Sequence, residues 1–104
     1  MTLRKHLPNR REHVLVNFTT ADGFRYTAGL GYFDDGRLAE IFLNAESGTA
    51  IETAARDSAV VASLALQHGV PTETIRRAVT RKGNGEASGP LGALLDLLVS
   101  GIEP

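Results

Sequence analysis

The sequence predicts an α+β domain in which a three-stranded antiparallel meander is followed by three helices packed on one face of the sheet. Residues 14–43 alternate apolar and polar side chains with the period of two that marks a strand, and Asp-Gly turns divide them. Residues 49–101 then change to helical spacing, with Gly and Pro at the breaks. Strands followed by helices, rather than alternating with them, indicate an α+β fold.

Three strands are expected, over residues 14–19, 24–33 and 37–43. The turns that join them, at 21–23 and 34–36, each end in a Gly that can adopt a positive φ. Gly29 and Gly31 fall on one face of the middle strand. Glycines there indicate a close backbone approach, and we expect a helix to lie flat on that face.

Three helices are expected, over residues 49–68, 72–82 and 88–101. The first begins with a capping box made by Thr49 and Glu52, and Gly69 ends it because Gly takes the left-handed conformation readily. Thr72 is expected to cap the second helix, and the run 83–85 (Gly-Asn-Gly) closes it. The third helix starts after a Ser-Gly-Pro sequence and carries leucines at helical spacing.

Length and composition exclude several kinds of protein. The chain has 104 residues, which suits one domain, and it contains no cysteine. Disulfides, thiolate zinc sites, thiol nucleophiles and dithiol redox chemistry are therefore excluded. No apolar stretch approaches the ~20 residues of a membrane span. The N-terminal sequence does not resemble a signal peptide, so a cytoplasmic location is expected.

Charge is unevenly distributed although the formal total is only −1. Residues 1–13 carry four cationic side chains against Glu12 and are expected to form a basic, flexible arm. A single folded domain over 14–100 follows. The near-neutral total gives no overall attraction to nucleic acid or to an anionic membrane.

No catalytic constellation emerges from the pattern. The serines lie in no Gly-x-Ser-x-Gly elbow, and the spacing of His6 and His13 matches no common metal-ligand motif. We therefore expect no catalytic residue, no metal and no other cofactor, and a protein that is not an enzyme. The loop ending in Ser47, Gly48 and Thr49 leads into a helix N-terminus that could hold an anion, although capping alone accounts for it.

Residues 61–82 have the spacing of a helix-turn-helix. A small residue, Ala65, precedes Gly69 in the turn, and Ile75 would anchor the second helix. That helix could contact phosphates or guanine edges through Arg76, Arg77, Arg81 and Lys82. The same spacing occurs in helical hairpins that bind no DNA, and Glu73 would lie near the groove-facing start.

A longer part of the chain, residues 26–98, resembles the TSCPD domain family. The resemblance lies in 35–43 (Asp-Gly-Arg-Leu-Ala-Glu-Ile-Phe-Leu), Gly48-Thr49, 63–71 (Ser-Leu-Ala-Leu-Gln-His-Gly-Val-Pro) and 88–92 (Ser-Gly-Pro-Leu-Gly). This family is found at the C-terminal end of adenosylcobalamin-dependent (class II) ribonucleotide reductases and in small stand-alone proteins. The resemblance implies a shared fold and an association with a reductase or with nucleotide metabolism.

This chain departs from the family's pattern in one respect that bears on activity. The family is named after a Thr-Ser-Cys-Pro-Asp element, and the reductases carry cysteines near the C-terminus, whereas this chain has none. Thiol relay and zinc binding are therefore not implied. A chain of this length also has no room for a reductase catalytic barrel, so reductase activity by itself is excluded.

Two functional hypotheses result. The first is a non-catalytic accessory or interaction module of TSCPD type, which binds a protein partner or itself through a sheet edge or the last helix. Leucines 94, 95, 97 and 98 cover more of that helix than one buried stripe needs, so a homodimer surface is one way to cover them. The alternative is a small nucleic-acid-binding regulator that uses the helix-turn-helix-like unit.

Overall fold

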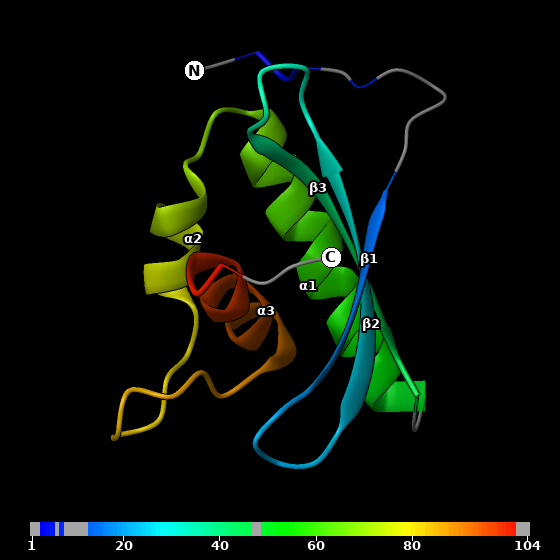
Figure 1. Cartoon of the computed structure of the whole chain (residues 1–104), viewed down its shortest axis with the longest axis vertical. Helices are drawn as coiled ribbons and strands as arrows, with labels where there is room; N and C mark the ends of the chain where they lie inside the picture. The colour runs from blue at the N-terminus through cyan, green and yellow to red at the C-terminus, as the bar shows by residue number, and fades with distance from the viewer. Residues whose placement is uncertain (1–2, 6, 8–12, 47–48, 102–104) are drawn as a thin grey trace.

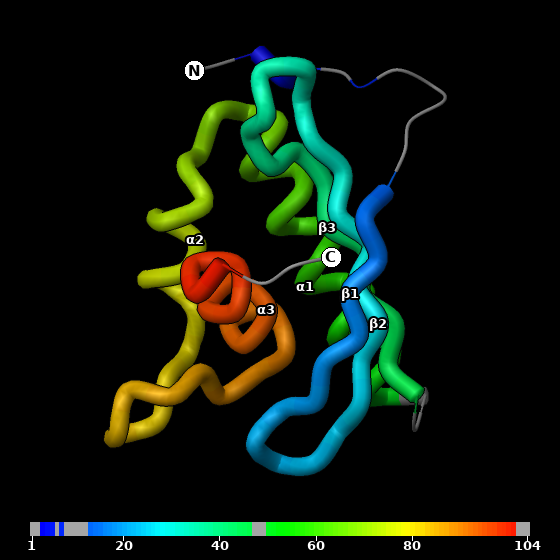
Figure 2. Tube along the Cα trace, in the orientation of Figure 1, coloured from blue at the N-terminus to red at the C-terminus, as the bar shows by residue number. Residues whose placement is uncertain are grey.

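The computed structural model of the chain is a three-stranded antiparallel sheet with three helices on one side of it, as the sequence predicts (Figure 1). It describes residues 3–5, 7, 13–46 and 49–101. The strands lie in the order β1-β2-β3, with bounds β1 (Val14–Thr19), β2 (Arg25–Tyr32) and β3 (Leu38–Ala45). The helices are α1 (Thr49–Gln67), α2 (Thr72–Ala78) and α3 (Pro90–Val99). Figure 2 shows α1 running along the sheet and α3 lying between α2 and the strands.

The two hairpin turns form where the sequence places them. Gly23 and Gly36 have φ values of +88° and +89°, which side-chain-bearing residues rarely adopt. The N–H of Gly23 donates to the carbonyl of Thr20 (2.9 Å), and the N–H of Gly36 donates to the carbonyl of Phe33 (2.9 Å). These turns set the register in which Val16 faces Ala28 and Ala28 faces Leu43.

The hydrophobic core lies between the sheet and helices α1 and α3. Its most deeply buried large side chains are at most 1% exposed and come from both halves of the chain: Leu30, Ile41, Leu43, Leu94 and Leu95. Each contributes about 1.5–3 kcal/mol by leaving water. The buried face of α1 consists mostly of small residues, Ala55, Ala59 and Ala62, with Leu66 near its end, and the alanines allow the helix to pack closely on β3.

The two glycines of β2 lie on the opposite face of the sheet, so the prediction of a helix packed over them is wrong. A Cβ at Gly29 would lie 3.6 Å from the Cβ of Phe42, and a Cβ at Gly31 would lie 3.0 Å from a carboxylate oxygen of Glu40. The nearest neighbours are therefore side chains of β3, followed by those of Leu15 and His13. The helices cover the other face because the apolar side chains of β2, such as Leu30, point there.

Helix α1 ends in a Schellman motif. The N–H of Val70 donates to the carbonyl of Ala65 (3.0 Å), and the N–H of Gly69 donates to the carbonyl of Leu66 (3.1 Å). Gly69 has a φ of +93°, as expected for the residue after the helix. No helix in the described part of the chain is long and apolar enough to cross a membrane.

Helix α2 is shorter than predicted, ending at Ala78 rather than at residue 82. The following residues form a small hairpin instead: the N–H of Lys82 donates to the carbonyl of Glu86 (2.8 Å), and the N–H of Ser88 donates to the carbonyl of Thr80 (2.9 Å). These cross-hairpin bonds replace the helical ones. The N-cap is Pro71, with no side-chain hydrogen bond, so the prediction that Thr72 caps this helix is also wrong.

Helix α3 places its leucines in the core. Leu94 and Leu95 are buried, while Leu97 and Leu98 are partly buried and pack against the same cluster. The helix is enclosed by α1, α2 and the sheet, which is why it is apolar on more than one side. The predicted excess of leucine is therefore largely covered within one chain, and the strongly exposed large apolar side chain within Pro90–Val99 is Val99.

Candidate functional site

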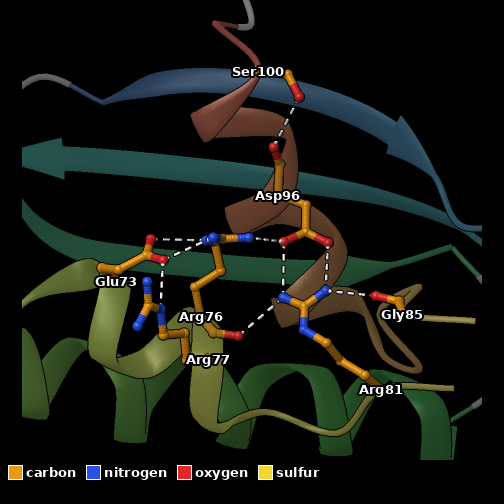
Figure 3. Close-up of polar contacts among 7 residues, drawn as sticks. All are labelled: Glu73, Arg76, Arg77, Arg81, Gly85, Asp96 and Ser100. Atoms are coloured by element: carbon orange, nitrogen blue, oxygen red, sulfur yellow. Dashed lines mark hydrogen bonds and ion pairs between the residues drawn. The ribbon is translucent and has the colours of Figure 1, made fainter. Parts of the chain in front are cut away.

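The four basic residues predicted as a binding site lie on α2 and the hairpin after it, and two of them bind one carboxylate. Both nitrogens of the Arg81 fork donate to Asp96, Nη1 to Oδ2 and Nη2 to Oδ1, each at 2.8 Å (Figure 3). Arg76 donates from Nη1 to the same Oδ1 (3.0 Å) and from Nε and Nη2 to Glu73 (2.8 and 2.7 Å). Asp96 belongs to α3, so these bonds join α2 and its hairpin to α3.

The same contacts change the acidity of the carboxyl groups. The hydrogen bond from Arg81 is the main cause that lowers the pKa of Asp96 to about 2. The hydrogen bond from Arg76 is the main cause that lowers the pKa of Glu73 to about 2. Both carboxylates are therefore charged at neutral pH, and the pKa of each arginine is raised in return.

This ion-pair cluster has a structural role that the packing explains. Helix α2 has no fully buried residue, and Ile75, together with Val79 just after the helix, packs against the core only partly buried. Polar contacts therefore add to this limited apolar packing. Arg81 also donates to two backbone carbonyls, those of Arg76 (3.0 Å) and Gly85 (3.1 Å), which fixes the hairpin against the helix end (Figure 3). Charge-assisted, bidentate hydrogen bonds suit this task because they fix geometry as well as distance.

The other two predicted cations also have acidic partners. Arg77 is 78% exposed and donates from Nε to Glu73 (3.0 Å). Lys82 lies 3.3 Å from Asp22 in the turn between β1 and β2. The four residues thus do not form one helical face of unpaired cations. The sequence could not reveal the partners of Arg81 and Lys82, because Asp96 and Asp22 are distant along the chain.

The predicted anion-binding loop falls largely outside the described residues. Ser47 and Gly48 are not among them, and Thr49 begins α1 without a described side chain. Glu52, the expected partner of Thr49 in a capping box, forms an ion pair with Nη2 of Arg56 (2.7 Å). Anion binding at this loop stays a prediction. Within the described ranges, no group of three or more potential ligand side chains could hold a metal ion.

A groove that the sequence did not reveal runs along the outer edge of β3, between that strand and α1. Its volume is about 460 Å³. At its floor the Oγ of Ser63 accepts from the N–H of Ile41 (2.8 Å) and donates to the carbonyl of the same residue (3.1 Å). One turn later the Nε2 of Gln67 donates to the carbonyl of Ala39 (3.1 Å). Two polar side chains of α1 thus satisfy three outward backbone groups of the edge strand, both of Ile41 and the carbonyl of Ala39.

The wall of this groove is apolar and reaches the surface. Phe42, Val60 and Leu64 line it, and all three are exposed. Its polar rim includes Arg4, whose Nε donates to Gln67 (2.7 Å), and Arg56. Val60 and Leu64 are one helical turn apart on the side of α1 that does not face the core. This i, i+4 apolar pair was the signal in the sequence that could have located the groove.

The chain is similar to part of several enzymes named vitamin B12-dependent ribonucleotide reductase. It is 37% identical over 78 residues to that of Agrobacterium fabrum, a match that covers 74% of this chain and 6% of the reductase. It is 34% identical over 74 residues to that of Bradyrhizobium diazoefficiens (70% and 6%) and over 73 residues to that of Streptantibioticus cattleyicolor (69% and 12%). This chain resembles a short segment of these reductases.

The similarity confirms the expected relation to ribonucleotide reductases at the level of one segment. The chain spans only 6 to 12% of the length of these relatives. No family model matches the chain. No solved structure matches it either.

Proposed function

We propose that this chain is a non-catalytic interaction module of the TSCPD type that associates with a ribonucleotide reductase. The similarity to a segment of vitamin B12-dependent reductases, 37% identity over 78 residues, is the observation that carries this proposal. The matched segment is a small fraction of each reductase, so nearly all of such an enzyme has no counterpart in it. A module of this size suits a role in which it binds a larger protein.

The arrangement of charged side chains supports binding rather than catalysis. The carboxylates of Glu73 and Asp96 are occupied by arginines that hold elements of the fold together. His13 lies 2.9 Å from Glu40, and the Nδ1 of His68 lies 2.8 Å from the carbonyl of Leu64 at the end of α1. Each of these contacts has a structural explanation that requires no substrate.

The groove between β3 and α1 is the surface that we assign to the reductase. Its exposed apolar wall offers an area that a protein partner would remove from water, and its rim carries charges of both signs, with Arg4, Glu40 and Arg56 among the lining residues. In the reductases the matched segment is continuous with a much longer chain, so a surface suited to that chain is expected on the segment.

The proposal is tested with a purified vitamin B12-dependent reductase from the organism that makes this chain. Biolayer interferometry should detect binding, and Val60→Glu should weaken the affinity by at least about tenfold. Burying a carboxylate in an apolar contact costs about 1.4 kcal/mol or more of binding free energy. The matched control is Val61→Glu. Val61 is the next residue on α1 and is 67% exposed, against 56% for Val60, but it lines a different groove, beside α2.

Three outcomes would count against the proposal. Absence of binding would contradict the association with the reductase. Equal losses of affinity from Val60→Glu and Val61→Glu would contradict the assignment of the groove between β3 and α1 as the binding surface. Ribonucleotide reduction by the isolated chain, with the cofactor added, would contradict the non-catalytic role. Binding of a DNA duplex at low salt, lost in Arg77→Glu, would favour the nucleic-acid alternative instead.

A further inference from the structure

The two edges of the sheet differ in how their backbone groups are satisfied. The β3 edge is covered by side chains of α1, which bond both backbone groups of Ile41 and the carbonyl of Ala39. The β1 edge has no such cover: among the described residues, no helix or loop makes a backbone hydrogen bond to Val14–Thr19 from outside the sheet. An edge strand in this state is a template for another strand.

The bonding pattern shows which groups of β1 point outward. Since Ser63 bonds both the N–H and the carbonyl of Ile41, those groups point away from β2. Neighbouring residues alternate in direction along an antiparallel ladder, so Leu30, opposite Ile41, bonds instead to its β1 partner Val14. The alternate residues of β1 therefore direct their N–H and carbonyl groups outward: Leu15, Asn17 and Thr19.

The composition of β1 does nothing to prevent pairing. The strand reads Val-Leu-Val-Asn-Phe-Thr, with no charged residue and no proline. β-branched and aromatic residues favour strands, whereas Lys, Pro and inward charges are the usual means of blocking an edge. Leu15 is 68% exposed on the uncovered face, so the edge also presents apolar surface to water.

We propose that two copies of this chain pair through β1, antiparallel, with Asn17 on the two-fold axis. Leu15 of each copy then faces Thr19 of the second copy, and Asn17 faces its own equivalent. Each of these pairs exchanges both of its backbone hydrogen bonds, because the outward groups are arranged symmetrically about residue 17. The result is a continuous sheet across both copies, with all helices on one face.

A second copy fits this edge for reasons of symmetry and charge. Pairing about Asn17 keeps the faces matched, so the core-facing Val16 lies opposite Phe18 of the second copy. Because β1 carries no charge, self-pairing places no like charges opposite each other. The last turn of α3 lies beside the end of β1, where Leu97 and Thr19 line one shallow pocket. In the paired arrangement, this turn of α3 adds to the contact between the two copies on the face of the sheet that carries the helices.

Solution mass and one lysine substitution test the proposal. Light scattering should give twice the chain mass of 11.1 kDa at high concentration, and Asn17→Lys should return it to one chain by placing two ammonium groups opposite each other. Asn44→Lys is the matched control. Asn44 lies in the same row of the sheet, since Thr27 faces both Asn17 and Asn44, but it belongs to the covered β3 edge.

A cross-linking experiment tests the register independently of any loss of stability. The chain has no cysteine, so Asn17→Cys introduces a single thiol. Facing residues of a hydrogen-bonded pair lie about 5.5 Å apart at Cα, within the span of a disulfide. Mild oxidation should link Asn17→Cys much faster than Asn44→Cys. A single-chain mass at every concentration, or equal cross-linking at both positions, would overturn the proposal, as would pairing of β1 only with a different protein.

Discussion

Replacing Ser63 by Ala should destabilise the protein through the edge of β3. The Oγ of Ser63 makes two hydrogen bonds to the backbone of Ile41, at 2.8 and 3.1 Å, and the residue is only 9% exposed. Alanine removes both bonds without removing apolar volume. The N–H and the carbonyl of Ile41 then keep no protein partner on the outer side of the sheet.

The size of the effect follows from these contacts. A hydrogen bond contributes a net ~0.5–1.5 kcal/mol, so two bonds amount to about 1–3 kcal/mol. Because alanine is a better helix former than serine, the substitution also stabilises α1 by roughly 0.5 kcal/mol. We therefore expect a net loss of about 1.5 kcal/mol in the free energy of unfolding, or a fall in Tm of roughly 6–12 °C for a domain of this size.

Thermal unfolding followed by circular dichroism measures this loss, and a second serine of α1 is the control. The Oγ of Ser58 donates to the carbonyl of Ala55, one turn earlier in the same helix (2.8 Å). Ser58→Ala therefore removes one bond within the helix and improves helix propensity, but it leaves the hydrogen bonds between Ser63 and β3 in place, so its Tm should change little. Equal Tm values for Ser63→Ala and Ser58→Ala would refute the reasoning that the edge contact stabilises the fold.

Two further predictions concern α3. Asp96→Asn should lower Tm at neutral pH and flatten its decline in acid, measured as Tm against pH. Arg81 holds the pKa of Asp96 near 2, below its ordinary value of 3.8. The ion pair of Asp96 therefore stabilises the fold above pH ~4, and this stabilisation is lost as the pH falls toward 2. An acid profile of Asp96→Asn identical to that of the unsubstituted protein would contradict this prediction. Gly92→Ala should lower the free energy of unfolding by about 1 kcal/mol despite better helix propensity, since its Cβ would lie 2.9 Å from side-chain carbons of both Ala87 and Val79. Denaturant unfolding measures this change. A free energy of unfolding that rises would show that these neighbours move aside and would contradict the prediction.

The fold followed from local patterns because those patterns have local causes. Alternation over residues 14–43 specifies strands whichever element later covers them, and Gly23, Gly36 and Gly69 mark points where the backbone needs a positive φ. The length of α2 could not be predicted in this way. Residues 79–82 were expected to continue the helix, but the backbone groups of Thr80 and Lys82 bond to Ser88 and Glu86 across a hairpin, and this pairing outweighs helix propensity.

The candidate site was less accessible to sequence reasoning. The arginines were visible as a basic cluster, but Asp96 lies 20 residues after Arg76 and 15 after Arg81, on another helix. Whether a cation binds a ligand or an internal carboxylate depends on that distant partner. The glycines of β2 show the same difficulty, because a period of two identifies two faces without saying which one the helices cover.

The sequence alone therefore determined the order of strands and helices, the positions of the turns and the relation to ribonucleotide reductases, since each depends on neighbouring residues or on a linear pattern. The tertiary structure decided which groups are already occupied. It pairs Arg81 with Asp96 and bonds Ser63 to Ile41 at the β3 edge, and among the described residues it gives the β1 edge no such backbone partner. Hydrogen bonds and ion pairs form only between atoms within a few ångström of each other, and only the folded chain brings these atoms that close.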